Sequence, residues 1–234
     1  MGRRIAALAL LLAATLARPG DARALEPFVA EFSGEWKGIG IATSSLVLRR
    51  DAEPNEWIYT WRISARGVFR MLYSDDLVQT SWFTAGNDGL RPRRYEATQG
   101  AKAVMLTYDW DAHRARGSEE GKPLELELAA RTLDVMAIQV EVMQDLKSGN
   151  LPPRFSIIDK DEIKEFLYTR EGTARLHTAI GDLDTVIVAS QREGGDRVLK
   201  MWFAPSRGFA PVQAERFRGG KTEFAMRIRS LSGP

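Results

Sequence analysis

Apolar and polar side chains alternate along much of the chain with a period of two, the period of a β-strand that buries one face. The pattern is clearest near the C-terminus. In residues 222–229, one face carries Phe224, Met226 and Ile228, and the other carries Glu223, Arg227 and Arg229. The positive side chains of this stretch are therefore expected to be the solvent-facing side of a strand, not a basic surface built for an anionic polymer.

The segment before it shows the same alternation. Leu199, Met201 and Phe203 share one face, and Lys200 and Trp202 share the opposite one. Residues 204–208 contain proline and end in glycine, which favours a tight turn, and the Gly-Gly pair in residues 218–221 favours a hairpin turn. Residues 197–230 are thus predicted to form three consecutive antiparallel strands.

Further upstream, turn signals rich in Gly, Asp and Asn separate other β-rich stretches. Two of these stretches predict apolar faces, one with Trp57, Tyr59, Trp61 and Ile63, the other with Val104, Leu106, Tyr108 and Trp110. The spacing predicts about twelve or thirteen strands. A sheet of that size is expected to curl or close, because long open edges invite aggregation.

One segment has a helical period instead. Thr132 is placed to cap a helix, Asp134 falls in its first turn, and Gly149 is a C-terminal stop. The apolar stripe consists of Leu133, Met136, Val140, Met143 and Leu146. We predict an amphipathic helix of about fifteen residues, with the stripe packed on the concave face of the sheet and Glu141 exposed.

The N-terminus predicts export. Arg3 and Arg4 precede a short apolar run over residues 5–17, and Ala22-Arg23-Ala24 forms an A-x-A cleavage site. Residues 1–24 are read as a cleaved secretory signal peptide, and 25–234 as a single β-barrel-like domain. The apolar run is shorter than the about 20 residues that a membrane span needs. The paired arginines leave the twin-arginine route open, but no Phe-Leu follows them, so the general secretory route is preferred.

Charge and cysteine content exclude several classes of partner and site. The chain has 33 Lys and Arg against 31 Asp and Glu, and residues 1–24 hold four arginines and one aspartate. Cleavage therefore changes the formal charge from +2 to −1, which argues against a nucleic-acid partner. There is no cysteine, so disulfides, thiolate metal sites and a lipid anchor after the cut are excluded. The mature protein is expected to be soluble and periplasmic.

No familiar catalytic motif is present, and the sharpest candidate is Asp109-Trp110-Asp111-Ala112-His113. On a strand, its two carboxylates and imidazole would share a face and could hold a metal or exchange protons. A strand that ends in a polar turn is the preferred interpretation. His177 is expected to be an exposed or hydrogen-bonded strand residue, and turns account for the remaining acidic candidates, which are Asp159, Asp161, Glu162, Asp182 and Asp184. We expect no catalytic residue, metal or cofactor. The alternative is a carboxylate-dependent hydrolase or lyase that acts on an envelope polymer.

The aromatic residues offer a different kind of site. Six tryptophans could line an apolar cavity in an incompletely filled barrel, although core packing is preferred for most of them. Lys200 and Trp202 are the candidate ligand-binding residues, because together they could meet an anionic head group and an apolar tail. The competing interpretation is a lysine that extends past a buried ring to reach water.

Several segments together resemble a known family. They are "LEPFVAEFSGEWKGIGIA", "SWFTAGNDGLRPRRYEA", "LTYDWD", the helix ending "DLKSGN" and "LKMWFAPSRGFAPVQAE", and they span about Pro27 to Leu231. In this order and spacing they resemble the exported bacterial family catalogued as domain of unknown function 3108. Thr132-Leu133-Asp134 departs from the Asp-x-Leu-Ser-like start expected there.

The resemblance implies a mainly β fold, a large twisted antiparallel β-barrel or half-barrel wrapped around one α-helix, similar in outline to periplasmic lipoprotein carriers. It implies no reaction. We therefore expect a non-enzymatic protein that binds an apolar or amphipathic envelope component such as a lipid, or that supports envelope integrity, with an envelope protein as a possible partner.

Overall fold

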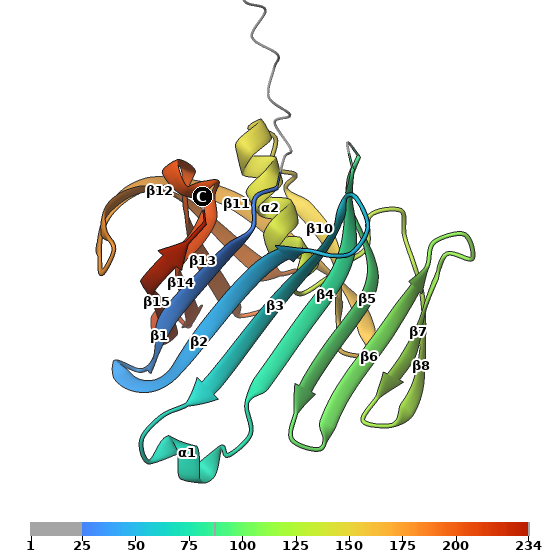
Figure 1. The fold of residues 1–234 in the computed structure, drawn as a ribbon, viewed down its shortest axis with the longest axis horizontal. Coiled ribbons are helices and arrows are strands. Elements are labelled where there is room, and N and C mark those ends of the chain that lie inside the picture. Colours follow the sequence, from blue (N-terminus) through green and yellow to red (C-terminus); the bar gives the residue numbers. More distant parts are fainter. Residues whose placement is uncertain (1–24, 87, 234) are drawn as a thin grey trace, which may run out of the picture.

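The structure is a computed structural model that describes residues 25–86 and 88–233, so the predicted signal peptide lies outside the described residues. Strands dominate the described chain (Figure 1). They are β1 (Phe28–Trp36), β2 (Ile39–Arg50), β3 (Glu56–Ala65), β4 (Leu77–Gly86), β5 (Gly89–Gln99), β6 (Lys102–Asp109), β7 (Arg114–Glu119), β8 (Lys122–Glu127), β9 (Leu133–Asp134), β10 (Arg154–Asp159), β11 (Glu162–Thr178), β12 (Gly181–Arg192), β13 (Arg197–Ala204), β14 (Ala210–Arg218) and β15 (Lys221–Ser232). The helices are α1 (Phe69–Leu72), α2 (Ala137–Ser148) and a short 3₁₀ turn at Pro205–Arg207.

The fifteen strands form one sheet in the order β8-β7-β6-β5-β4-β3-β2-β1-β15-β14-β13-β12-β11-β10-β9. Neighbours are antiparallel except β9 and β10, and the first and last strands of the chain pair with each other. The sheet curls (Figure 1), as expected for its size, but β8 and β9 remain its two edges. Of the two forms that were expected, a barrel or a half-barrel, the closed one is therefore not formed. β9 is only two residues long and is followed by α2, so the strand run ends there without reaching β8.

The three predicted C-terminal strands are confirmed as β13, β14 and β15. Gly208 closes the β13–β14 connection with φ of 60°, and Gly219 and Gly220 close the next hairpin with φ of 55° and 75°. These left-handed angles suit glycine, which has no Cβ to clash. Met226 and Ile228 are buried while Arg227 and Arg229 are exposed, as the alternation predicts.

Helix α2 begins later than predicted. Thr132 does not cap it; its hydroxyl bonds to the backbone of Ala129. The Oδ1 atom of Asp134, which belongs to β9, accepts the N–H groups of Met136 and Ala137 at 2.9 and 2.8 Å. Because its carboxylate takes the first free N–H groups, Asp134 performs the capping role in place of Thr132, two residues further along. The predicted stop is correct, since Gly149 is left-handed with φ of 75°.

The prediction of a helix with one apolar stripe is wrong. Residues 137–146 are buried throughout except for the half-buried Gln139, and Glu141, expected to be exposed, is 1% exposed. Its carboxylate accepts the N–H of Leu90 at 2.8 Å and pairs with Arg131 at 2.7 Å. These partners offset the free-energy cost of removing the charge from water. α2 contacts β4, β5 and β9 and lies between the two arms of the curled sheet (Figure 1).

The close fit of α2 depends on a glycine. Gly89 opens β5 with φ of 109°, and a Cβ placed on it would lie 2.6 Å from Oε1 of Glu141. Any larger residue would therefore push the carboxylate away from the N–H of Leu90. α2 and the strands next to it form what we call the closed end of the interior. The open end is the opposite one, where the β3–β4, β12–β13 and β14–β15 connections lie.

Candidate functional site

The interior is not filled at the open end. Two adjoining cavities, of about 540 and 430 Å³, lie between α2 and the inner face of the sheet. They share four lining residues, Gln139, Leu199, Met201 and Arg216, so we treat them as one feature, the inner cavity. Each part falls within the range of about 300 to 1,000 Å³ that is typical of small-molecule sites.

Most of the wall is apolar and comes from widely separated elements. The larger part is lined by Ile138 and Val142 of α2, Phe166 and Tyr168 of β11, and Phe203 of β13; the smaller by Phe32, Leu46, Trp61, Ile63, Leu77 and Phe224. Alternate side chains of β13 line the cavity at successive depths. Leu199 at the open end is 37% exposed, and Phe203, four residues further along the strand, is 1% exposed. An apolar chain could therefore enter past Leu199 and lie against Phe203.

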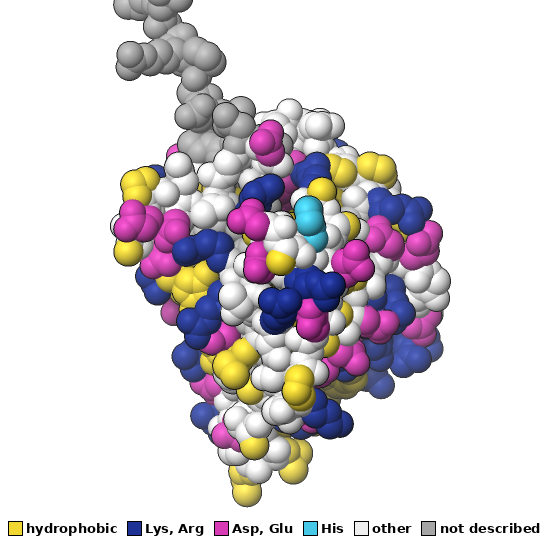
Figure 2. Space-filling model, turned by 90° about the vertical axis from the view of Figure 1, so that its right-hand side faces the viewer, with side chains coloured by type: hydrophobic (Ala, Val, Ile, Leu, Met, Phe, Trp, Pro, Cys, Tyr) yellow, Lys and Arg dark blue, Asp and Glu magenta, His cyan; other side chains and the backbone are white. Residues whose placement is uncertain are grey.

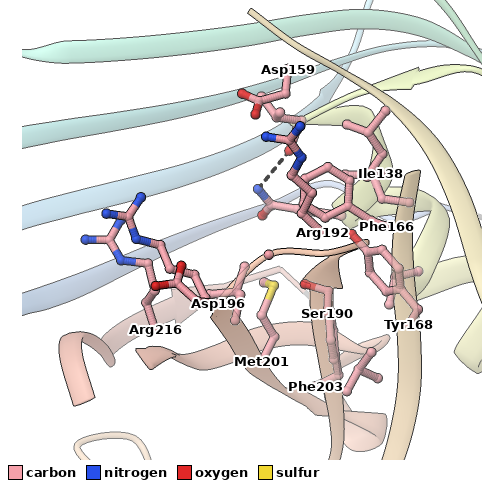
Figure 3. Close-up of a pocket in the computed structure, with 18 residues that line it drawn as sticks. Ile138, Asp159, Phe166, Tyr168, Ser190, Arg192, Asp196, Met201, Phe203 and Arg216 are labelled. Carbon is pink, nitrogen blue, oxygen red and sulfur yellow. Dashed lines mark hydrogen bonds between the residues drawn. The ribbon is translucent and has the colours of Figure 1, made fainter. Parts of the chain in front are cut away.

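Three arginines lie at the mouth. Arg192 ends β12, Arg197 begins β13 and Arg216 lies in β14. Arg197 and Arg216 both pair with Glu223, at 3.8 and 3.4 Å, so one carboxylate serves two guanidinium groups. Figure 3 shows Arg216 and Asp196 on one side of the cavity and Ile138, Phe166 and Tyr168 on the other. The site thus combines apolar depth with a positive rim.

The carboxylates that line the cavity are already paired. Asp159 accepts from Lys164 at 2.9 Å, and Asp196 accepts from Arg218 at 2.8 Å. The hydrogen bond from Arg218 holds the pKa of Asp196 below its ordinary value, so this group stays ionised at neutral pH and is unsuited to donate a proton. The carboxylate-dependent alternative gains no support from these two groups.

A buried polar cluster supports the wall formed by α2. The hydroxyl of Ser81 donates to Asp134 at 2.7 Å, and Asp134 in turn caps the helix. Burial raises the pKa of Asp134 to about 6, and burial also raises the pKa values of Tyr95 and Tyr108 well above their usual range. Desolvation dominates these shifts because charge is costly away from water. The cluster fixes where α2 begins and hence where Ile138 and Gln139 meet the cavity.

The structure places Lys200 and Trp202 away from the inner cavity. Their neighbours Leu199, Met201 and Phe203 line it, and alternation along β13 directs Lys200 and Trp202 to the opposite face. There Lys200 pairs with Glu171 at 2.7 Å and lies 5.6 Å from the ring centroid of Phe217. A ligand role for Lys200 and Trp202 stays a prediction, and the cavity is built from the other face of the same strand.

The other candidate residues are at turns. Asp109 ends β6 and accepts the N–H of Ala112 at 2.9 Å, so the preferred interpretation of a strand ending in a polar turn is confirmed. His177 is 84% exposed and bonds Asp182 at 2.6 Å, as expected for an exposed strand histidine. Within residues 25–86 and 88–233, no group of three or more His, Cys, Asp or Glu side chains is placed to hold a metal ion.

The tryptophans divide between core, cavity and surface. Trp57 is fully buried, whereas Trp61, Trp110 and Trp202 are half-buried against the core. Trp61 lines the cavity. Trp82 carries Arg94 on its face, and Trp36 is 38% exposed. Core packing, predicted for most of the six, therefore holds for Trp57 and in part for Trp61, Trp110 and Trp202, whereas Trp36 and the half-buried Trp82 are not among the residues of that core.

Sequence reasoning missed the polar residues of the cavity. Arg216 was not singled out from the sequence, yet it shares the cavity with Ala214 two positions earlier. The same alternation places Val188, Ser190 and Arg192 of β12 on one face. Continuing the period of two from the buried valine would have predicted Arg192. Gln139 gave no such signal, because its role depends on where α2 begins.

The fold and the cavity define a class, a mainly β protein with a single open sheet and an apolar inner cavity. The chain matches the family described as Protein of unknown function (DUF3108) over residues 31–222, and it belongs to this family. The resemblance noted in the sequence is thereby confirmed. No curated protein matches the chain.

Two solved structures have a distant similarity to this chain. One is a candidate exported protein with a YmcC-like fold from Bacteroides fragilis, with 7% identity, a TM-score of 0.40, and coverage of 89% of this chain and 96% of that one. The other is a candidate lipoprotein from Parabacteroides distasonis, with 9% identity, a TM-score of 0.36 and the same coverage. None of the helices in the described part of the present chain is long and apolar enough to cross a membrane.

Proposed function

We propose that this protein is an exported, soluble, non-enzymatic binding protein that takes an amphipathic, anionic envelope component such as a lipid into its inner cavity. The observation that carries the proposal is the cavity itself, with apolar walls and arginines at its mouth. Apolar walls favour a hydrocarbon chain, and guanidinium groups favour a carboxylate or phosphate head group.

The decrease in side-chain exposure from the mouth inward supports an amphipathic ligand that enters the cavity with its apolar tail first. Exposure falls from Leu199 at the mouth to Phe203, and Val188 beside them is buried. Arg197 and Arg216 share one glutamate, so they retain net positive charge for a head group.

Location is part of the proposal. We propose that residues 1–24 are removed in the periplasm and that the protein acts there without a lipid anchor. N-terminal sequencing of the periplasmic form should begin at Leu25. A form that keeps residues 5–17, or one that is recovered only with membranes, would contradict this.

The binding test uses 11-(dansylamino)undecanoic acid, a fluorescent apolar chain with a carboxylate, and its neutral primary amide. Dansyl emission should rise when the purified protein takes up either probe. Met201→Asp should abolish uptake of both probes, because it places a carboxylate on the apolar wall. Arg216→Gln should weaken binding of the acid by roughly tenfold and leave the amide nearly unchanged.

Lys200→Ala and Trp202→Ala serve as matched controls on the opposite face of the same strand. They should leave uptake unchanged if the inner cavity is the site. Loss of uptake in these variants would instead favour the original prediction of Lys200 and Trp202 as ligand residues. Wild-type protein that takes up neither probe, and that carries no lipid detectable by mass spectrometry after solvent extraction, would end the proposal.

A further inference from the structure

Large apolar side chains gather outside the cavity as well. The described chain has ten exposed large apolar side chains, of which Leu199 lines the cavity. Six others lie at the open end: Trp36 at the end of β1, Ile39 at the start of β2, and Val68, Met71, Leu72 and Tyr73 between β3 and β4. We call these six residues the apolar tip. Three of them are exposed almost as fully as in an extended chain, Val68 at 71%, Leu72 at 75% and Met71 at 86%.

The apolar tip projects from the sheet. α1 lies beyond the ends of β3 and β4 (Figure 1), and Figure 2 shows hydrophobic side chains at the same lower extremity of the molecule. The N–H of Arg66 donates to the carbonyl of Ile41 at 2.8 Å, which brings the β3–β4 connection alongside the start of β2. The β1–β2 and β3–β4 connections therefore leave the same end of neighbouring strands.

The tip is continuous with the mouth of the inner cavity. Ile63, near the end of β3, and Leu77, at the start of β4, both line the cavity, and they flank the connection that carries α1. An apolar molecule that leaves the cavity past these residues meets further apolar surface instead of water. The tip is thus placed at the entrance, not at an unrelated site.

The charged side chains at the base of the apolar tip carry a net positive charge. Residues 66–73 contain two arginines, Arg66 and Arg70, and no acidic residue. The first acidic side chain that pairs there is Asp76, which accepts from Arg70 at 2.6 Å and from Arg62 at 3.1 Å. One carboxylate again serves two guanidinium groups. Asp75 adds a second carboxylate, so the three arginines (62, 66 and 70) and two aspartates of this region leave a net charge of +1 at the base of the exposed Val68, Met71 and Leu72.

We propose that the apolar tip inserts into the interfacial layer of an anionic phospholipid bilayer and docks the mouth of the cavity on the membrane surface. A bilayer accepts a convex apolar projection, whereas a protein partner would have to offer a matching groove. Trp36 and Tyr73 are residue types that favour the membrane interface, and arginines attract anionic head groups. Large exposed apolar patches are uncommon on monomers without such a role.

This inference goes beyond ligand binding and is testable without a ligand in the cavity. The chain lacks cysteine, so Leu72→Cys introduces a single thiol that can carry the fluorophore NBD. The protein, purified after expression of the full chain, is mixed with vesicles of phosphatidylcholine alone or of phosphatidylcholine with phosphatidylglycerol. NBD emission should rise and shift to the blue, more strongly with the anionic vesicles. The matched control is NBD on Leu167→Cys, 39% exposed on β11, which should not respond.

A second variant set measures how far binding depends on the tip. Val68→Ser/Met71→Ser/Leu72→Ser should lower vesicle partitioning by roughly tenfold or more in flotation, because partitioning scales with the apolar area inserted. Met105→Ser/Leu167→Ser, exposed apolar residues on strands elsewhere, should not lower it. All variants should melt near the wild-type temperature, because the replaced side chains contribute little to the core.

Some results would overturn the inference. One is wild-type protein that floats with neither vesicle type. Another is flotation that the tip and control variants lose equally. A third is a concentration-dependent dimer that the tip variant dissolves, because the tip would then cover a second copy of the chain. Failure here with normal uptake of the dansyl acid would leave the proposed ligand binding standing, and the converse result would leave the membrane contact standing.

Discussion

The two ends of the interior are packed in opposite ways. At the closed end, polar groups enter the core with partners: Glu141 bonds Leu90 and Arg131, and Asp134 bonds Ser81 and two helix N–H groups. At the open end, the same sheet leaves apolar side chains around a cavity. One end is filled and fixed, and the other is apolar and incomplete.

The closed end therefore contributes mainly to the stability of the fold, and the open end to the proposed ligand binding. Burial of apolar area stabilises a fold by about 25 cal/mol per Å², so side chains left around a cavity forgo part of that stabilisation. A sheet of this length can tolerate the loss because the closed end and the long strand ladders hold the fold. Substitutions at the two ends should therefore have unequal effects on the free energy of unfolding.

The largest effect should come from a charge placed in the closed end. Val140 is fully buried in α2, so Val140→Asp should lower the free energy of unfolding by about 3 to 5 kcal/mol or more, enough to unfold the protein at 37 °C. Urea melts followed by circular dichroism measure this. Lys147→Gln, exposed on the same helix, is the control and should change stability by less than about 0.5 kcal/mol. Similar losses in both variants would contradict the buried position of α2.

Next in size is a pH effect from Asp134. Its carboxyl has a pKa of about 6 in the folded protein against an ordinary value of 3.8. Between these pH values the folded state holds more protons, so the free energy of unfolding falls as pH rises, by up to about 3 kcal/mol, and is unaffected by this group below about pH 4. Asp134→Asn removes the titration. The stability of the wild type relative to this variant should decline from pH 4 to 7; a constant difference would show that burial does not shift Asp134.

Glu141→Gln should have a smaller effect. The amide can still accept the N–H of Leu90 but loses the charge that Arg131 meets, so we expect a loss of about 2 kcal/mol. Glu125→Gln is the matched control, because Glu125 pairs with Arg114 and Arg116 at a side chain that is 46% exposed. That control should change stability by less than about 0.5 kcal/mol. Equal losses would show that burial adds nothing to the Glu141 pair.

The smallest effect should come from the open end. Leu199→Ser, at the mouth of the cavity, should change the free energy of unfolding by less than about 0.5 kcal/mol while it weakens uptake of the dansyl acid. A loss comparable with that of a core leucine, about 2 to 5 kcal/mol, would mean that the open end is a second core and would remove the contrast between the two ends.

The sequence predicted what depends on local period and turn chemistry. Phe224, Met226 and Ile228 share a face as expected, and Gly149 and Gly208 end their elements as expected. Each of these follows from backbone geometry within a few residues. The family and the mainly β fold could be recognised for the same reason, because they rest on an ordered series of such local patterns.

The errors arose where a distant segment decides the outcome. Glu141 is polar and was assigned to water, but Leu90 and Arg131, far away in the chain, allow it to be buried. The start of α2 was misplaced because Ser81 and a two-residue strand hold Asp134 outside the helix. Arg216 lines the cavity only because β13 and β14 meet with that register. No window of single-sequence periodicity contains these partners.

The pairing of β1 with β15 has a consequence for how the molecule is assembled. Val29 lies opposite Ser232, so the two strands bridge almost the whole length of the chain. Contacts between residues so far apart form slowly, because a long loop must close before they are made. β1 and β14 each keep an unpaired edge until residues 221–232 have been synthesised and delivered. The sheet therefore cannot be completed in step with synthesis, and a chain that stops short of β15 exposes two strand edges to its neighbours.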